Sequence, residues 1–174
     1  IHHVIGVANN NSTHGFVERL GFTLIGPLDA KIVWGAPTPL ATSKPCDWER
    51  SWTRDSYAWR IAKPNASYCI ARYGGRFECL ADTGKFGIQA ILRVESDEQF
   101  VQLLESCLPH RRQHCQKLWI GRSRRMHLSR AAGWNIPPKL RRSPLNLIYR
   151  PLTDDAFVPA AEQLEFSLLD FDAY

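Results

Sequence analysis

Short apolar segments alternate with polar turns along most of the chain, and this pattern predicts many short β-strands. The expected strands cover residues 2–7, 22–26, 31–34, 67–73, 76–81, 87–95, 117–120, 146–149 and 164–169. Turn-forming residues separate several of these strands, and Gly74-Gly75 in particular suits a tight hairpin turn. Consecutive hairpins of this kind predict a mainly antiparallel sheet.

Four segments have features of amphipathic helices. They are His14–Leu20, residues 48–60, the stretch from the capping box Ser96–Gln99 to Pro109, and the stretch from Ser123 to Ala132. Gly21 follows the first where a left-handed residue is wanted at a helix end. Trp48, Trp52 and Trp59 share one face of the second, which predicts three core residues. Strands and helices together predict an α/β (α+β) fold with a mixed, mainly antiparallel sheet flanked by helices.

The order of elements suggests an internal repeat. Residues 4–22 and 118–134 each contain a strand, a polar turn, a short helix and a glycine followed by an aromatic residue. This similarity favours two copies of one supersecondary unit. The proline-rich residues 35–46 are the best candidate for a linker.

Length and composition place the chain among globular proteins. Its 174 residues suit one domain or one and a half, and 44% apolar with 22% charged residues argues against intrinsic disorder. No apolar run approaches the roughly 18 residues of a membrane span, and the first residues lack a basic leader, so we expect a cytoplasmic protein without membrane contact. The chain's one methionine is Met126, which is consistent with a fragment of a longer protein.

Metal and disulfide chemistry have little support. The five cysteines are Cys46, Cys69, Cys79, Cys107 and Cys115. Their odd number and the absence of Cys-x-x-Cys spacing favour free buried thiols in a reducing compartment. His110 and His114 have the i, i+4 spacing of helical metal ligands, but basic neighbours argue against a cation there. We therefore expect no metal site and no required cofactor.

The net charge of +5 is spread unevenly. Residues 106–153 contain many lysines and arginines and no acid, whereas residues 154–174 contain acids and no base. Arg122, Ser123, Arg124 and Arg125 stand at an expected helix start, where backbone N–H groups also attract anions. These four residues form the best candidate anion site. Its occupant is either a phosphorylated ligand or the acidic tail.

Other partners are also consistent with this charge. Trp119, Trp134 and Tyr149 lie among the basic residues, and aromatic rings can stack on bases. A second interpretation is therefore a non-enzymatic module whose basic face, residues 106–153, binds nucleic acid or an acidic protein. A third is a homo-oligomer, because an unpaired edge at Val4–Val7 would invite a second chain.

Three stretches resemble the GNAT superfamily of acyl-CoA-dependent N-acyltransferases, in particular two-lobed bacterial members. They are Val4–Val7 with Asn10 and Phe16–Phe22, Tyr57–Arg60 with Pro64 and Tyr68, and Phe166–Asp172. The resemblance implies a first-lobe remnant of strand, helix and strand at 1–34, a Pro/Trp-rich linker at 35–56 and a GNAT-like lobe at 57–174. It also adds Asn10 to the ligand-binding residues and predicts a mixed sheet joining 67–95 to 117–120.

The sequence departs from this family where catalysis would need it. The family's pyrophosphate loop, Arg/Gln-x-x-Gly-x-Gly/Ala at a helix start, is missing. The position of the family's tyrosine acid is Val17 or Ser129, according to which glycine ending is aligned, and neither side chain protonates a thiolate readily. We therefore expect a degenerate or incomplete acyltransferase-like protein that binds acyl-CoA or another phosphorylated ligand. Its catalytic residues are unknown, and we expect no turnover by this chain alone.

Overall fold

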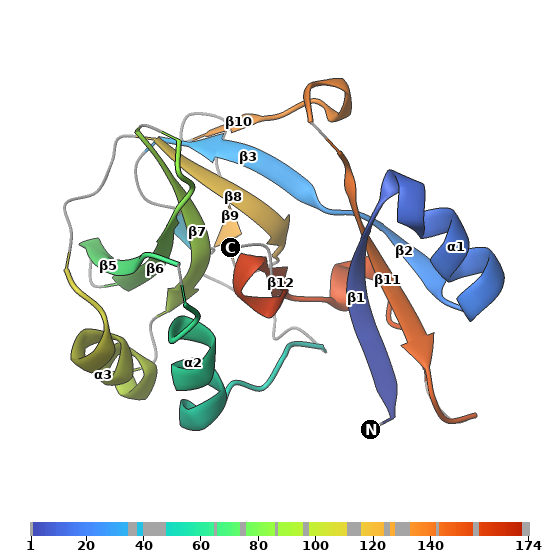
Figure 1. Cartoon of the computed structure of the whole chain (residues 1–174), viewed down its shortest axis with the longest axis horizontal. Helices are drawn as coiled ribbons and strands as arrows, with labels where there is room; N and C mark the ends of the chain where they lie inside the picture. The colour runs from blue at the N-terminus through green and yellow to red at the C-terminus, as the bar shows by residue number, and fades with distance from the viewer. Residues whose placement is uncertain are drawn as a thin grey trace.

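The computed structural model describes residues 2–34, 38–39, 48–64, 66–73, 76–85, 87–95, 98–110, 116–123, 126–127, 133–141, 143–154 and 157–171. The strands are β1 (His3–Asn9), β2 (Thr23–Pro27), β3 (Asp29–Val33), β4 (Thr38–Pro39), β5 (Tyr68–Tyr73), β6 (Arg76–Asp82), β7 (Ile88–Glu95), β8 (Gln116–Arg122), β9 (Met126–His127), β10 (Gly133–Asn135), β11 (Leu145–Pro151) and β12 (Phe166–Ser167). The helices are α1 (Asn10–Leu20), α2 (Arg54–Ile61) and α3 (Glu98–Cys107), with 3-10 turns η1 (Pro138–Leu140), η2 (Ala161–Gln163) and η3 (Leu168–Asp170). The described residues form a mixed α/β fold with mainly antiparallel sheets flanked by three helices (Figure 1).

The larger sheet has the order β10-β3-β8-β7-β6-β5. Its neighbouring strands are antiparallel except β7 and β8, which run parallel and are joined by α3. This pair provides the predicted junction between residues 67–95 and residues 117–120. Pairing of β7 with β8 runs from Ile88↔Gln116 to Ile91↔Trp119.

Beyond that point the C-terminal segment replaces β7 as the neighbour of β8. Gly121 pairs with Asp29 of β3 on one side and with Ser167 of β12 on the other, so β12 lies on the side where β7 had been. A Cβ atom on Gly121 would lie closer than 3.0 Å to the Phe166 carbonyl oxygen. The glycine therefore allows the C-terminal segment to approach the strand (Figure 1).

The smaller sheet, β1-β11-β2, carries α1 on one face (Figure 1). The helix begins at the N-cap Asn9, which shares a capping box with Ser12, and ends at Gly21 with φ 67°. The helix thus begins four residues before the expected start at His14, with Ser12 as its third residue. Strands from residues 1–34 enter both sheets, because β1 and β2 pair with β11 and β3 pairs with β8.

Most of the core lies between the larger sheet and the helices α2 and α3. Tyr57, Leu104 and Leu168 are fully buried there, one each from α2, α3 and η3. A second cluster around Leu80, Ile91 and Trp119 lies on the opposite face of the sheet. The C-terminal turn is therefore a core element as well as the neighbour of β8.

The expected helix over residues 48–60 is wrong in its first half. The helix begins only after Thr53, whose hydroxyl accepts a hydrogen bond from the Ser56 amide, and residues 48–53 precede it as an irregular segment. Trp48 is half-buried beside Leu164, and Trp52 is buried. Trp59 is 74% exposed, so the tryptophans do not form one core stripe.

Two further expectations are corrected by long-range pairing. Met126–His127 form β9 and pair with β4, and Gly133–Asn135 form β10 and pair with β3. The described residues between Ser123 and Ala132 are therefore not helical, contrary to the prediction. The predicted repeat of the strand–helix unit at 118–134 is therefore wrong there. The expected strand over 164–169 shrinks to β12, because the Asp170 carboxylate accepts hydrogen bonds from Ser167 and stabilises a 3-10 turn.

Candidate functional site

The helix α2 places one aromatic side chain in solvent beside the C-terminal segment. Tyr57, Arg60 and Ile61 lie on the buried face of α2, at the i, i+3 and i+4 spacing of one helical face. Trp59 lies outside that face and remains exposed. An exposed tryptophan ring is a large apolar surface available to a partner.

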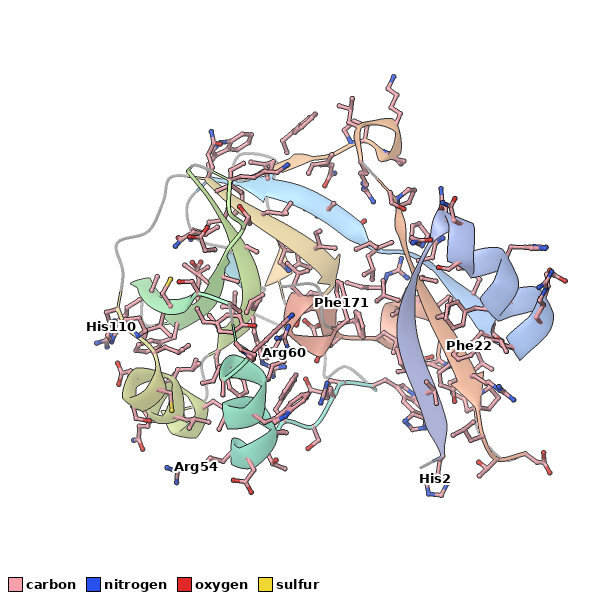
Figure 2. The ribbon with its side chains drawn as sticks, viewed as in Figure 1. His2, Phe22, Arg54, Arg60, His110 and Phe171 are labelled. Atoms are coloured by element: carbon pink, nitrogen blue, oxygen red, sulfur yellow. The ribbon has the colours of Figure 1, made fainter. Side chains whose placement is uncertain are left out.

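Arg60 fastens the C-terminal segment to α2. Its guanidinium donates to the Leu169 carbonyl oxygen at 3.3 Å, to the Tyr68 hydroxyl at 2.8 Å and to the Phe171 carbonyl oxygen at 3.3 Å. Figure 2 shows this side chain reaching from α2 toward Phe171. A buried charge requires such partners, and these fix the position of residues 169–171.

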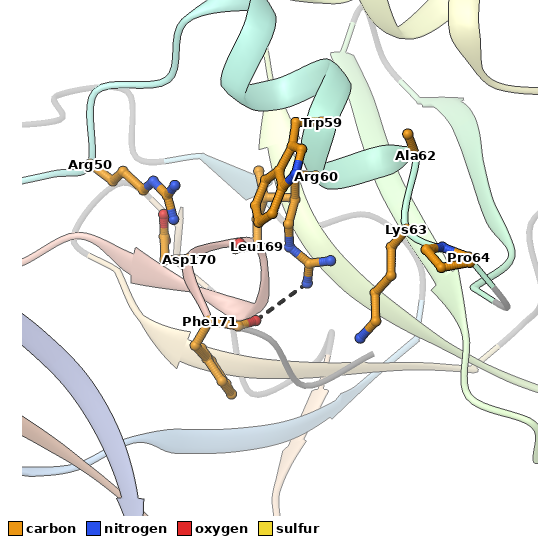
Figure 3. Close-up of a pocket in the computed structure, with 9 residues that line it drawn as sticks. All are labelled: Arg50, Trp59, Arg60, Ala62, Lys63, Pro64, Leu169, Asp170 and Phe171. Atoms are coloured by element: carbon orange, nitrogen blue, oxygen red, sulfur yellow. Dashed lines mark hydrogen bonds between the residues drawn. The ribbon is translucent and has the colours of Figure 1, made fainter.

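Asp170 is held from two sides. One carboxylate oxygen accepts the Trp52 indole N–H at 3.1 Å, and the other accepts the Ser167 amide at 2.7 Å and its hydroxyl at 2.9 Å. The Arg50 guanidinium stacks 4.0 Å above the Trp52 ring. Arg50 is thereby positioned at the edge of the same site as Asp170 (Figure 3).

These elements enclose a cavity of about 470 Å³, within the range of small-molecule sites (Figure 3). It is lined by Arg50, Trp59, Arg60, Ala62, Lys63, Pro64, Leu169, Asp170 and Phe171. A second cavity of about 230 Å³ shares Arg50 and Asp170 with the first and extends toward His3 and Trp48. We call the two cavities together the α2 groove. The larger cavity brings three cations together with one carboxylate, which favours an anionic ligand.

The residues that line this groove were not predicted from the sequence. Trp59, Arg60, Lys63 and Pro64 are close neighbours in the chain, and the combination of an aromatic ring with two cations was the available signal. Asp170 could not be added to them from the sequence, because it comes from a segment more than 100 residues away.

The residues predicted for the anion site lie elsewhere. Arg122 ends β8 with a nitrogen 3.5 Å from the Pro27 carbonyl oxygen. Asn10 is exposed at the start of α1, and its side-chain oxygen accepts a hydrogen bond from Asn146 at 3.3 Å. Because Asn146 pairs with Pro27, both predicted residues lie near the same end of the smaller sheet.

The rest of that predicted site is only partly described. Ser123 follows β8 and is half-buried, whereas Arg124 and Arg125 lie outside the described residues. The helix start that was expected to add backbone N–H groups is not formed, because Met126 already belongs to β9. Ser123, Arg122 and Asn10 do not line the α2 groove.

The described basic residues of 106–153 do not form one exposed face. They are Lys117, Arg122, Lys139, Arg141 and Arg150. Lys117 is fully buried against Glu78, and Arg141 donates to the carbonyl oxygens of Leu28 and Ile136. Lys139 and Arg150 are exposed. In the acidic tail, Asp170 accepts hydrogen bonds from Trp52 and Ser167, and Asp172 lies outside the described residues.

The buried acid Glu78 and the buried thiol of Cys79 do not line the groove. Burial raises the pKa of Glu78 against the opposing effect of Lys117, and burial raises the pKa of the Cys79 thiol to about 12. Cys69 and Cys79 are buried, as expected, but Cys107 is exposed. A thiol with so high a pKa remains protonated and is a poor nucleophile. Cys46, Cys115 and His114 lie outside the described residues, and the remainder holds no group of three potential metal ligands.

Comparison with protein-family models, with curated proteins and with solved structures found no match. None of the helices in the described ranges combines the length and apolar character needed to cross a membrane.

Proposed function

We propose that this protein binds a phosphorylated ligand that carries a planar ring, such as an acyl-CoA, in the larger cavity of the α2 groove. The observation that carries the proposal is the exposed Trp59 ring beside a cavity whose charged lining is mostly cationic. Guanidinium groups match phosphate oxygens in geometry and charge, and tryptophan rings stack on bases. The ring of the ligand would lie on Trp59, and its phosphates would lie toward Arg50 and Lys63.

The wider interpretation is a degenerate acyltransferase-like protein. The junction of β7 with β8 supports it, because the GNAT resemblance implied a mixed sheet joining these two stretches. Turnover is not part of the proposal. Asp170, the carboxylate that lines the larger cavity, already accepts three hydrogen bonds and is poorly placed to act as a base.

The test is isothermal titration of the wild-type protein with CoA, acetyl-CoA, ADP and adenosine. We expect the three phosphorylated ligands to bind and adenosine to bind more weakly. Trp59→Ala should weaken ADP binding by about 5- to 150-fold, the range expected for one stacked base. Arg50→Gln should weaken it by about tenfold or more, as expected for a lost charge-assisted hydrogen bond.

Two substitutions outside the groove serve as matched controls. Trp134→Ala removes another exposed tryptophan, and Lys139→Gln removes another exposed cation. Both should leave ADP binding unchanged. Absence of binding by every phosphorylated ligand, or equal losses in groove and control variants, would contradict the proposal. Salt-sensitive binding of an oligonucleotide alone, weakened by Lys139→Gln, would instead favour the basic stretch 106–153 as the binding surface.

A further inference from the structure

A separate cavity of about 310 Å³ lies where the larger sheet meets the segment that leads into β11. Its apolar lining consists of Leu28, Ala30, Leu118, Ile120, Ile136, Leu140 and Leu145, and its polar lining of Lys85, Arg141 and Ser143. None of these residues lines the α2 groove. We call this cavity the β3–β8 pocket.

The walls of the pocket are held in place by hydrogen bonds. The Ile136 amide donates to the Ala30 carbonyl oxygen at 2.9 Å, which ties the outer wall to β3. Arg141 donates to the carbonyl oxygens of Ile136 at 2.9 Å and Leu28 at 2.7 Å. These bonds join both sides of the pocket, so its shape exists before a ligand enters. Preformed walls reduce the ordering that binding would otherwise require.

The apolar lining is incompletely covered. Leu118 and Ile120 belong to a central strand, yet both are only half-buried, and Leu140 is 61% exposed. Several large aliphatic side chains therefore face a space that an apolar group could fill. Each methylene group transferred there from water would tighten binding by about fourfold.

The charge of the pocket is one-sided. Lys85 and Arg141 contribute two cations, and none of the described residues of the lining carries a carboxylate. The Arg141 hydrogen bonds to carbonyl oxygens use its Nε and Nη1 atoms, and Nη2 makes no hydrogen bond to another described residue. Lys85 is exposed, and its ammonium group has no hydrogen bond or ion pair in the described part of the chain.

We propose that the β3–β8 pocket binds an aliphatic monocarboxylate of short or medium chain length. The alkyl chain lies on Leu118, Ile120 and Leu140, and the carboxylate lies between Lys85 and Arg141. A volume near the lower limit of ligand sites favours a single short chain over a phospholipid.

Isothermal titration of the full chain with butanoate, hexanoate, octanoate and octanol tests the proposal. We expect affinity to rise about fourfold for each added methylene until the pocket is filled. Octanol should bind at least tenfold more weakly than octanoate, because it cannot form the charge-assisted hydrogen bonds. Failure of octanoate to bind at millimolar concentration, or equal binding of octanol, would overturn the proposal.

Substitutions at exposed positions locate the site without disturbing the core. Lys85→Gln and Leu140→Ser should each weaken octanoate binding severalfold, whereas Lys139→Gln and Leu20→Ser, at exposed positions outside the pocket, should not. Equal losses in all four variants would place the ligand elsewhere and refute the assignment. Trp59→Ala should leave octanoate binding unchanged, so this proposal and the proposed function can fail separately.

Discussion

Replacing Lys117 by methionine should be among the most damaging single substitutions in this protein. The Lys117 ammonium lies 2.5 Å from a Glu78 carboxylate oxygen, and both side chains are almost completely buried. The second Glu78 oxygen has no hydrogen-bond partner among the described residues. Removing the ammonium therefore leaves a buried carboxylate without a counter-charge.

The expected loss in the free energy of unfolding is about 3–5 kcal/mol, the usual cost of breaking a buried pair. With a urea m-value of about 2 kcal/mol/M, the unfolding midpoint would fall by about 1.5–2.5 M. The double variant Lys117→Met, Glu78→Met removes both charges, and we expect it to recover most of the lost stability. Urea titration at 25 °C of the wild type, the single variant and the double variant measures these changes in the free energy of unfolding.

The dependence on pH provides a second measurement. Burial raises the pKa of Glu78 in the folded state above its ordinary value near 4.5, so its protonated form favours folding. Stability from this group is fully present below pH 4.5 and is lost as pH rises through the folded-state pKa. Lys117 lowers that pKa, so the Lys117→Met variant should lose more stability than wild type as pH rises, by up to about 1.4 kcal/mol per unit. If Lys117→Met lowers the free energy of unfolding by less than about 1 kcal/mol and the loss does not vary with pH, the assignment of a buried ion pair between Lys117 and Glu78 is refuted.

Gly121→Ala should lower the free energy of unfolding by at least about 2 kcal/mol, because the new methyl group meets the Phe166 carbonyl oxygen; equal urea midpoints would contradict this. Iodoacetamide should label Cys107 in the native protein within minutes and Cys79 only on unfolding, as peptide mass spectrometry can show. We expect sedimentation to reveal self-association through the edge strand β1, and Val4→Lys to reduce it; a monomer at all concentrations would exclude this.

Local sequence rules predicted much of the secondary structure. Apolar segments bounded by turn residues gave correct positions for the strands from β5 to β8, and Gly21 ended α1 where a left-handed residue was expected. These features depend on neighbouring residues, which is why a single sequence reveals them. The predicted capping box Ser96–Gln99 lies partly outside the described residues, and α3 begins at Glu98, within that box.

Errors arose where distant residues determine the outcome. The spacing of Trp48, Trp52 and Trp59 suits a helix, yet Thr53 and Ser56 start the helix later and Trp48 pairs with Leu164 instead. Met126–His127 form the strand β9 because they pair with β4, almost 90 residues earlier in the chain. Tertiary pairing of this kind overrides local propensity and leaves no local signal.

The acidic residues of the C-terminal segment were one of two occupants considered for the predicted anion site at Arg122–Arg125. Asp170, one of those acids, lies instead beside Trp52 and α2. There it contributes the carboxylate of the larger cavity, while Arg60 holds the backbone on either side of it. An anion entering the α2 groove would therefore share its cations with Asp170. The short turn η3 thus supplies the carboxylate of the larger cavity and continues the segment that pairs with β8 beyond the end of β7.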